Sequence, residues 1–145
     1  MGASWTEDLA VGVPEIDDQH RELFRLVDML LAACLAGNGK TEAERVMGFL
    51  ECYVVDHFSA EEALMHRVGY PQVETHHLQH RQMVQRLAEL KVALARDGVT
   101  SLLVTQLNRS VVDWLLNHVG RSDRALADFL RARTPRNAEP LTRAR

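Results

Sequence analysis

The chain has 145 residues, of which 46% are hydrophobic and 26% are charged, and its net charge is −3. This length suits one domain, which can bury about two thirds of its unfolded surface. The charge is too mild to indicate nucleic acid or an anionic membrane as a partner. No run approaches the ~20 apolar residues of a membrane span.

The two ends of the chain lack the helical repeat of apolar residues that the middle of the chain shows. Residues 1–16 are predicted to form an N-terminal arm. Residues 1–13 carry Trp, Glu and Asp where a signal peptide needs a basic stretch and then an apolar one. Residues 133–145 are Arg-rich, contain two prolines and are predicted to be a flexible tail, so one domain covers 1–132. The cysteines, Cys34 and Cys52, fit a reducing compartment, and we expect a cytoplasmic location.

Apolar residues repeat every three or four positions in four segments, which predicts long helices over 17–36, 41–66, 72–96 and 100–118, the last with an extension to 132 left open. Turn residues separate these segments at 37–39, 69–71 and 97–98. Thr41, with Glu44 three residues on, is expected to cap the second helix. Short connections between long amphipathic helices predict an all-α fold, an up-down-up-down antiparallel four-helix bundle.

Four short motifs carry residues that bind metals, one on each predicted helix: Asp17–His20, His57–Glu61, His76–His80 and His118–Asp123. His57 and Glu61 are four residues apart, and so are His76 and His80. Four residues turn a helix by about 400°, so both members of each pair project from one face.

The four motifs are predicted to lie at one height in the bundle. Residues on neighbouring antiparallel helices are level when the turn falls midway between them. The midpoints between successive motifs fall at Asn38/Gly39, at Val68/Gly69 and near Gly98/Val99, which are the predicted turns. The motifs therefore form one layer across the bundle.

The last motif requires a local departure from the α-helix. Five residues turn an ideal helix by about 500°, which leaves Asp123 some 140° from His118. Both reach one site only if the helix unwinds, widens into a π-bulge or ends between them. Gly120 lies where it would permit such a change.

Five imidazoles and two carboxylates are too many ligands for one tetrahedral zinc ion, and no cysteine lies in the layer. A pair of iron or manganese ions tolerates this mixture. Suppose that Glu61 and Asp123 each bridge both ions, together with one oxo or hydroxo group. Three histidines then complete six bonds on one ion, and two histidines leave the other with five. One open position is what a small diatomic ligand requires.

These residues resemble the haemerythrin family, in particular the bacterial single-domain haemerythrins (bacteriohemerythrins). The resemblance runs from about Trp5 to Phe129, nearly the whole fold. It rests on residues 11–13, Asp17 with His20, the run 57–65, residues 69–71, His76 with His80, the run 114–118 and Asp123. No ligand of the family pattern is missing.

The resemblance implies a cofactor of two non-haem iron ions (Fe²⁺/Fe³⁺) with an oxo or hydroxo bridge. It places His76, His80 and His118 on the six-coordinate iron, His20 and His57 on the iron that takes O₂, and Glu61 and Asp123 between them. The family's apolar O₂ pocket maps onto Leu23, Phe58, Trp114, Leu115 and Val119. NO and small anions such as azide are further expected ligands of the open position.

Several neighbouring residues have simpler interpretations. His66 and His77 lie off the layer or off its face and are expected to be bystanders. Glu62 faces away from Glu61 and is expected to be solvated. Asp17 is either a cap of the first helix or a partner of an imidazole N–H, and the cap is favoured.

The predicted function is reversible O₂ binding by an oxygen carrier, storage or delivery protein that is not an enzyme. One alternative is a sensor of O₂, redox state or NO that acts through an unspecified protein partner. Another is a di-iron peroxidase or oxidase, although ferritin-like oxidases use more carboxylates and a Glu-x-x-His spacing.

Overall fold

The computed structural model describes residues 5–36 and 39–133, and within these ranges it contains helices and no strand. The helices are η1 (Glu7–Leu9, a 3₁₀ turn), α1 (Pro14–Leu35), α2 (Lys40–Val68) and α3 (Val73–Asp97). A fourth, continuous helix follows as α4 (Ser101–Gln106), η2 (Leu107–Val112), α5 (Asp113–Asn117), η3 (His118–Asp123) and α6 (Arg124–Arg133). In η2 and η3 the helix widens into π-turns.

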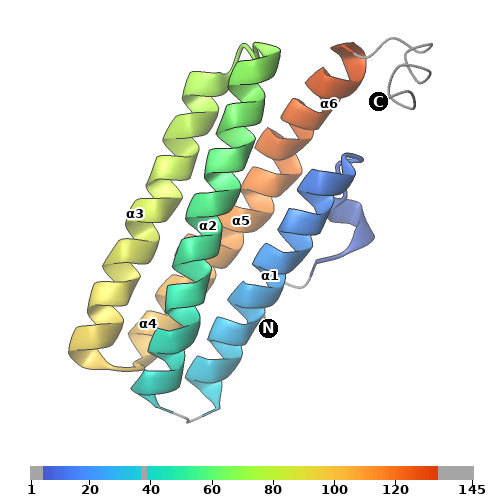
Figure 1. Cartoon of the computed structure of the whole chain (residues 1–145). Coiled ribbons are helices and arrows are strands. Elements are labelled where there is room, and N and C mark those ends of the chain that lie inside the picture. The colour runs from blue at the N-terminus through green and yellow to red at the C-terminus, as the bar shows by residue number, and fades with distance from the viewer. Residues whose placement is uncertain (1–4, 37–38, 134–145) are drawn as a thin grey trace.

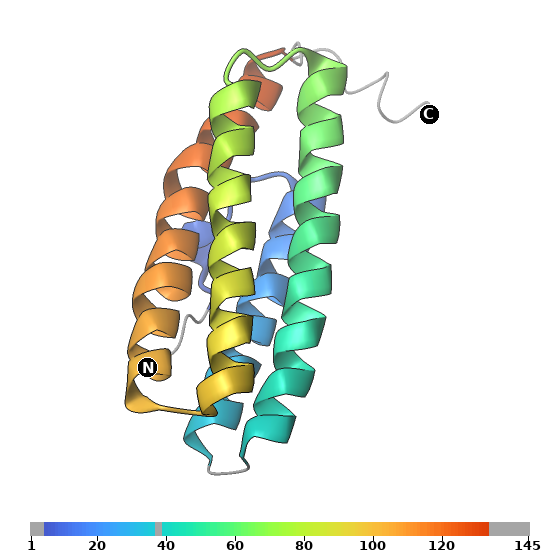
Figure 2. The same ribbon diagram turned by 90° about the vertical axis from the view of Figure 1, so that its left-hand side faces the viewer.

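The long helices run side by side and alternate in direction (Figures 1 and 2). Helix α1 packs on α2, α2 on α3, and α3 on the fourth helix. The predicted all-α, up-down-up-down bundle is therefore confirmed. The fourth helix extends to Arg133, so of its two predicted ends, at 118 and at 132, the later one is correct to within one residue. Apart from Arg133, the predicted tail lies outside the described residues.

The turns between the helices depend on glycine where the backbone needs a positive φ. Gly69 ends α2 with φ +67°, and the N–H of the following Tyr70 donates to the carbonyl of Met65 at 2.9 Å. This is a common way for a helix to end, and a side chain at Gly69 would strain it. At the other end of α2, Gly39 is the capping residue and no side chain caps the helix. The predicted cap at Thr41 is wrong, because the helix begins one residue before it.

The first helix begins at Pro14, three residues before the predicted start, with proline in the position that suits its fixed φ. Asp17 therefore lies inside α1, and neither prediction for it holds. Its buried carboxylate accepts hydrogen bonds from the N–H groups of Val11 at 2.8 Å and Gly12 at 3.2 Å. It fastens the N-terminal arm to α1. The side chain of Arg131 on α6 donates to the Val11 carbonyl and holds the arm from the other side.

The hydrophobic core is divided in two along the bundle. A large cluster runs from the Leu23–Phe58–Leu115 level toward the α1–α2 and α3–α4 turns. A small cluster around Met65, Tyr70 and Leu126 fills the opposite end. A layer of buried polar side chains separates them. Within the described ranges, no helix is both long and apolar enough to cross a membrane.

Candidate metal centre

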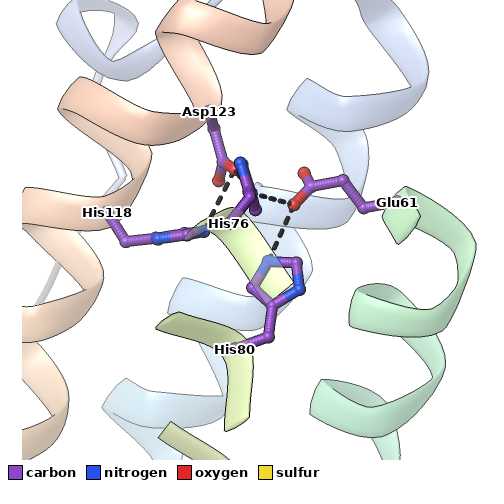
Figure 3. Close-up of side chains that lie close together, drawn as sticks. All are labelled: Glu61, His76, His80, His118 and Asp123. Atoms are coloured by element: carbon purple, nitrogen blue, oxygen red, sulfur yellow. Dashed lines mark hydrogen bonds and ion pairs between the residues drawn. The ribbon is translucent and has the colours of Figure 1, made fainter. Parts of the chain in front are cut away.

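All seven predicted ligands lie in the polar layer that divides the core. His20 projects from α1, His57 and Glu61 from α2, His76 and His80 from α3, and His118 and Asp123 stand at the two ends of η3. Each is at most 5% exposed. Five of them are drawn in Figure 3, where their polar atoms point toward one another. The structure therefore contains the single layer of side chains that the turn positions predicted.

These side chains form two groups that could each hold a metal ion. One contains Glu61, His76, His80, His118 and Asp123, and the other contains His20, His57, Glu61 and Asp123. Within each group the ligand atoms lie within 4.8 Å of one another. We call them the three-histidine group and the two-histidine group. The two carboxylates belong to both.

Each shared carboxylate directs one oxygen toward each group. Glu61 Oε1 lies 2.8 Å from His76 Nε2 and 2.9 Å from His80 Nε2, whereas Oε2 lies 3.9 Å from His57 Nε2. Asp123 Oδ1 lies 3.0 Å from His76 Nε2 and 3.2 Å from His118 Nε2. Its Oδ2 lies 2.9 Å from His20 Nε2. This division of oxygens is what two carboxylates need to bridge a pair of cations.

The helix widens into a π-turn between His118 and Asp123, which confirms the predicted departure from the α-helix. The wider turn brings the two side chains to one site despite their five-residue spacing. Gly120 is not required by space, because a Cβ there would meet nothing within 4 Å. Its φ also lies outside the positive range. The expectation that this glycine permits the turn finds no steric support.

Hydrogen bonds from outside the layer orient the imidazoles. Gln19 Oε1 accepts from His57 Nδ1 at 2.6 Å, and Gln79 Oε1 accepts from His118 Nδ1 at 2.9 Å. The Ser122 hydroxyl donates to the same Gln79 oxygen at 2.6 Å. An imidazole that donates its Nδ1–H keeps a lone pair on Nε2, and here each such Nε2 points to the centre.

The charges of the layer are set by burial and by mutual contact. Burial raises the pKa of Asp123, but attraction to the close imidazoles of His118, His20 and His76 outweighs it and holds that pKa well below the usual range. Burial lowers the pKa of His57 to about 4. The layer therefore presents an ionised carboxylate and a neutral imidazole, the protonation states that bind metals.

A second observation, the number of buried polar atoms without a hydrogen-bond partner, also fits a pair of metal ions. Within the described residues, buried side-chain polar atoms without a hydrogen-bond partner include His20 Nε2, His80 Nε2, His118 Nε2, Glu61 Oε2 and both Asp123 oxygens. Buried polar atoms are normally paired, and leaving one unpaired costs about 1–3 kcal/mol. A concentration of unpaired lone pairs at one point is what cations would satisfy.

A small apolar cavity of about 10 Å³ adjoins the layer on its large-cluster side. Four of the five predicted O₂-pocket residues line it, namely Leu23, Phe58, Trp114 and Leu115. Val119 is fully buried but is not among the lining residues. The rest of the lining was not anticipated and consists of Val27, Leu50, Val54, Met83, Leu87 and Val111.

Comparison with known proteins agrees with this geometry. Residues 11–130, most of the chain, match the family described as Hemerythrin HHE cation binding domain. The chain belongs to the haemerythrin family. The family resemblance inferred from the motifs is therefore confirmed.

Relatives support the membership over nearly the whole haemerythrin fold. A bacteriohemerythrin of Stenotrophomonas maltophilia is 32% identical over 129 residues, which cover 88% of this chain and 81% of the relative. A bacteriohemerythrin of Methylococcus capsulatus is 31% identical, with 89% and 97% covered. A crystal structure of a wild-type hemerythrin superposes with a TM-score of 0.75 at 30% identity, covering 86% of this chain and 95% of that one.

The expectation that Glu62 is a solvated side chain is also wrong. Both of its oxygens have protein partners, because Oε2 lies 2.7 Å from His80 Nδ1 and Oε1 lies 2.8 Å from His77 Nδ1. His66 is exposed and His77 lies outside both groups, so neither enters the centre. Gln19 and Gln79 were not anticipated either.

Proposed function

We propose that this haemerythrin binds O₂ reversibly at a pair of non-haem iron ions joined by Glu61, Asp123 and an oxo or hydroxo group. The three-histidine group would hold one iron and the two-histidine group the other. The observation that carries the proposal is the division of oxygens, since each carboxylate presents one oxygen to each group.

The number of imidazoles decides where O₂ would bind. With two carboxylate oxygens and one bridging group on each iron, three histidines complete six bonds. His20 and His57 would leave the second iron one bond short. When bound, a reduced iron pair supplies the electrons that hold O₂ and recovers them on release. NO and anions such as azide would compete for the same position.

The chain's own residues orient the ligands and keep water away. Gln19 and Gln79 hold His57 and His118 with Nε2 toward the centre. The ring of Phe58 stacks on His80 at 3.8 Å between ring centroids, and Trp114 stacks on His118 at 4.4 Å. The cavity beside them is lined by apolar and aromatic side chains. Such a wall would admit O₂ and disfavour the entry of water, which promotes oxidation of iron.

The function is that of an oxygen carrier, storage or delivery protein rather than an enzyme. Support comes from the relatives that bear the name bacteriohemerythrin and from the apolar lining of the cavity, which offers no acid or base to a substrate. A cytoplasmic location stays a prediction.

The test is O₂ cycling of the iron-loaded protein. The protein is reduced without air, exposed to O₂, and followed by its visible ligand-to-iron charge-transfer bands while vacuum and O₂ alternate. The bands are expected to appear and disappear over repeated cycles. Rapid turnover to a permanently oxidised product would contradict the carrier function and favour a peroxidase or oxidase. Iron analysis near one ion per chain would contradict the iron pair.

A further inference from the structure

Glu62 links a buried side chain of the metal centre to the protein surface. Its two carboxylate oxygens are both engaged, one by His80 Nδ1 at 2.7 Å and the other by His77 Nδ1 at 2.8 Å. The side chain of His80 is 2% exposed, that of Glu62 is 22% exposed and that of His77 is 44% exposed. The three form a hydrogen-bonded row from the centre outward, joining α2 to α3.

The other oriented imidazoles have neutral partners. His57 and His118 each donate to the amide oxygen of a glutamine, Gln19 and Gln79. His80 donates to a carboxylate instead. A carboxylate draws the Nδ1 proton more strongly than an amide does, and it makes the imidazole a more basic and more electron-donating ligand. The three-histidine group therefore contains one ligand of a different strength.

Glu62 keeps partial contact with solvent. Together with His77 and His80 it lines an open groove of about 410 Å³ between α2 and α3, whose other walls include Phe58, Arg81 and Val84. Partial contact with solvent reduces the cost of placing a charge beside the core. His77 engages the second oxygen, and this fixes the carboxylate in the orientation that meets His80.

We propose that Glu62 is a positioning residue, which holds His80 with its Nε2 lone pair toward the metal and, through its negative charge, lowers the reduction potential of the bound iron. The proposal rests on the proposed iron pair but not on reversible O₂ binding. A stronger donor favours the ferric state, so the charge of Glu62 sets the balance between oxidation states, and His77 maintains its position.

The test replaces the charge and keeps the shape. Glu62→Gln is expected to retain two irons per chain, to shift the reduction potential to a more positive value, and to lose iron to a competing chelator about tenfold more readily. Glu74→Gln is the matched control, because it removes the same charge from an exposed position near His76. Its potential is expected to stay close to that of the wild type. Potentials are measured without air by spectroelectrochemistry, so no O₂ is involved.

A second variant tests the same idea in the opposite direction. Gln79→Glu gives His118 a carboxylate partner and is expected to shift the potential to a more negative value, even if Glu62→Gln does not fold. Equal potentials for Glu62→Gln and Glu74→Gln, or no shift for Gln79→Glu, would overturn the proposal. Irreversible oxidation by O₂ with these shifts intact would overturn the carrier function alone. A wild-type protein that binds no iron pair would overturn both.

Discussion

The two ligand groups share their carboxylates and their burial but differ in the number and support of their imidazoles. The three-histidine group has His76, His80 and His118, and two of these rings are covered by the stacked rings of Phe58 and Trp114. The two-histidine group has His20 and His57, whose rings meet edge to face at 5.1 Å. Burial is equally deep in both.

For the proposed iron pair, this difference teaches that ligand number, rather than access to solvent, would separate a closed metal position from an open one. The protonation of the imidazoles differs as well. Burial by itself lowers the pKa of His76, but the close carboxylates of Asp123 and Glu61 raise it to about 9. His57 Nε2 lies farther from Glu61, at 3.9 Å from Oε2, so burial dominates and lowers the pKa of His57 to about 4. Near neutral pH these pKa values favour a protonated His76 and a neutral His57.

The largest expected effect comes from removing a ligand of the three-histidine group. His118→Ala takes away one imidazole and leaves the oxygens of Asp123 without that partner, so we expect one of the two irons to be lost. Iron analysis after gel filtration measures this. Retention of both irons would remove His118 from the ligand set.

The next effect concerns the wall between the groups and the large core cluster. Phe58→Ala enlarges the apolar cavity and uncovers His80, and it is expected to lower the free energy of unfolding by about 3–5 kcal/mol. Oxidation of the reduced protein in air is expected to become faster. Phe49→Ala on the same helix is the control, because Phe49 is 52% exposed and its loss should cost under about 1 kcal/mol. Equal losses in urea denaturation would contradict the role of Phe58.

A matched pair of substitutions compares the supports of the two groups. Gln19→Ala frees His57 in the two-histidine group, and Gln79→Ala frees His118 in the three-histidine group. Each is expected to lower the affinity of its own group for iron by about 10–100-fold, because the imidazole ring loses its fixed orientation. Chelator competition followed by spectroscopy of the remaining iron identifies which ion leaves. Loss of the same ion from both variants would contradict the division into two groups.

The smallest effect is expected for a histidine outside both groups. His77→Ala removes only the outer partner of Glu62, so the protein should keep both irons. This variant is also the control for His118→Ala, because both replace an imidazole by a methyl group. A loss of iron as large as that of His118→Ala would make His77 a ligand.

Much of the centre could be predicted because antiparallel bundles relate height to chain length. The turns near Gly39, Gly69 and Gly98 lie midway between successive motifs, and this places His20, His57, His76 and His118 in one layer without any knowledge of packing. The π-turn followed from the same geometry, since Asp123 cannot otherwise reach the site of His118. Local chemistry was less well anticipated at the start of α1, where Pro14 rather than Asp17 marks the first turn.

The surrounding hydrogen bonds could not be predicted in the same way. That Glu62 points about 100° away from Glu61 is correct, but what it then meets depends on how α2 and α3 are rotated against each other. The rotation places His77 and His80 opposite it, 15 and 18 residues along the chain. Gln19 and Gln79 have no charge or metal affinity that would mark them in a sequence. Their roles follow from position alone.

The central claim is that two irons share Glu61 and Asp123 and that the open position belongs to the two-histidine group. A crystal structure of the oxidised, iron-loaded protein soaked with azide tests it most directly. The account predicts two ions bridged by both carboxylates, with azide bound to the ion that His20 and His57 hold. A single ion in the layer, or azide on the ion held by His76, His80 and His118, would contradict it.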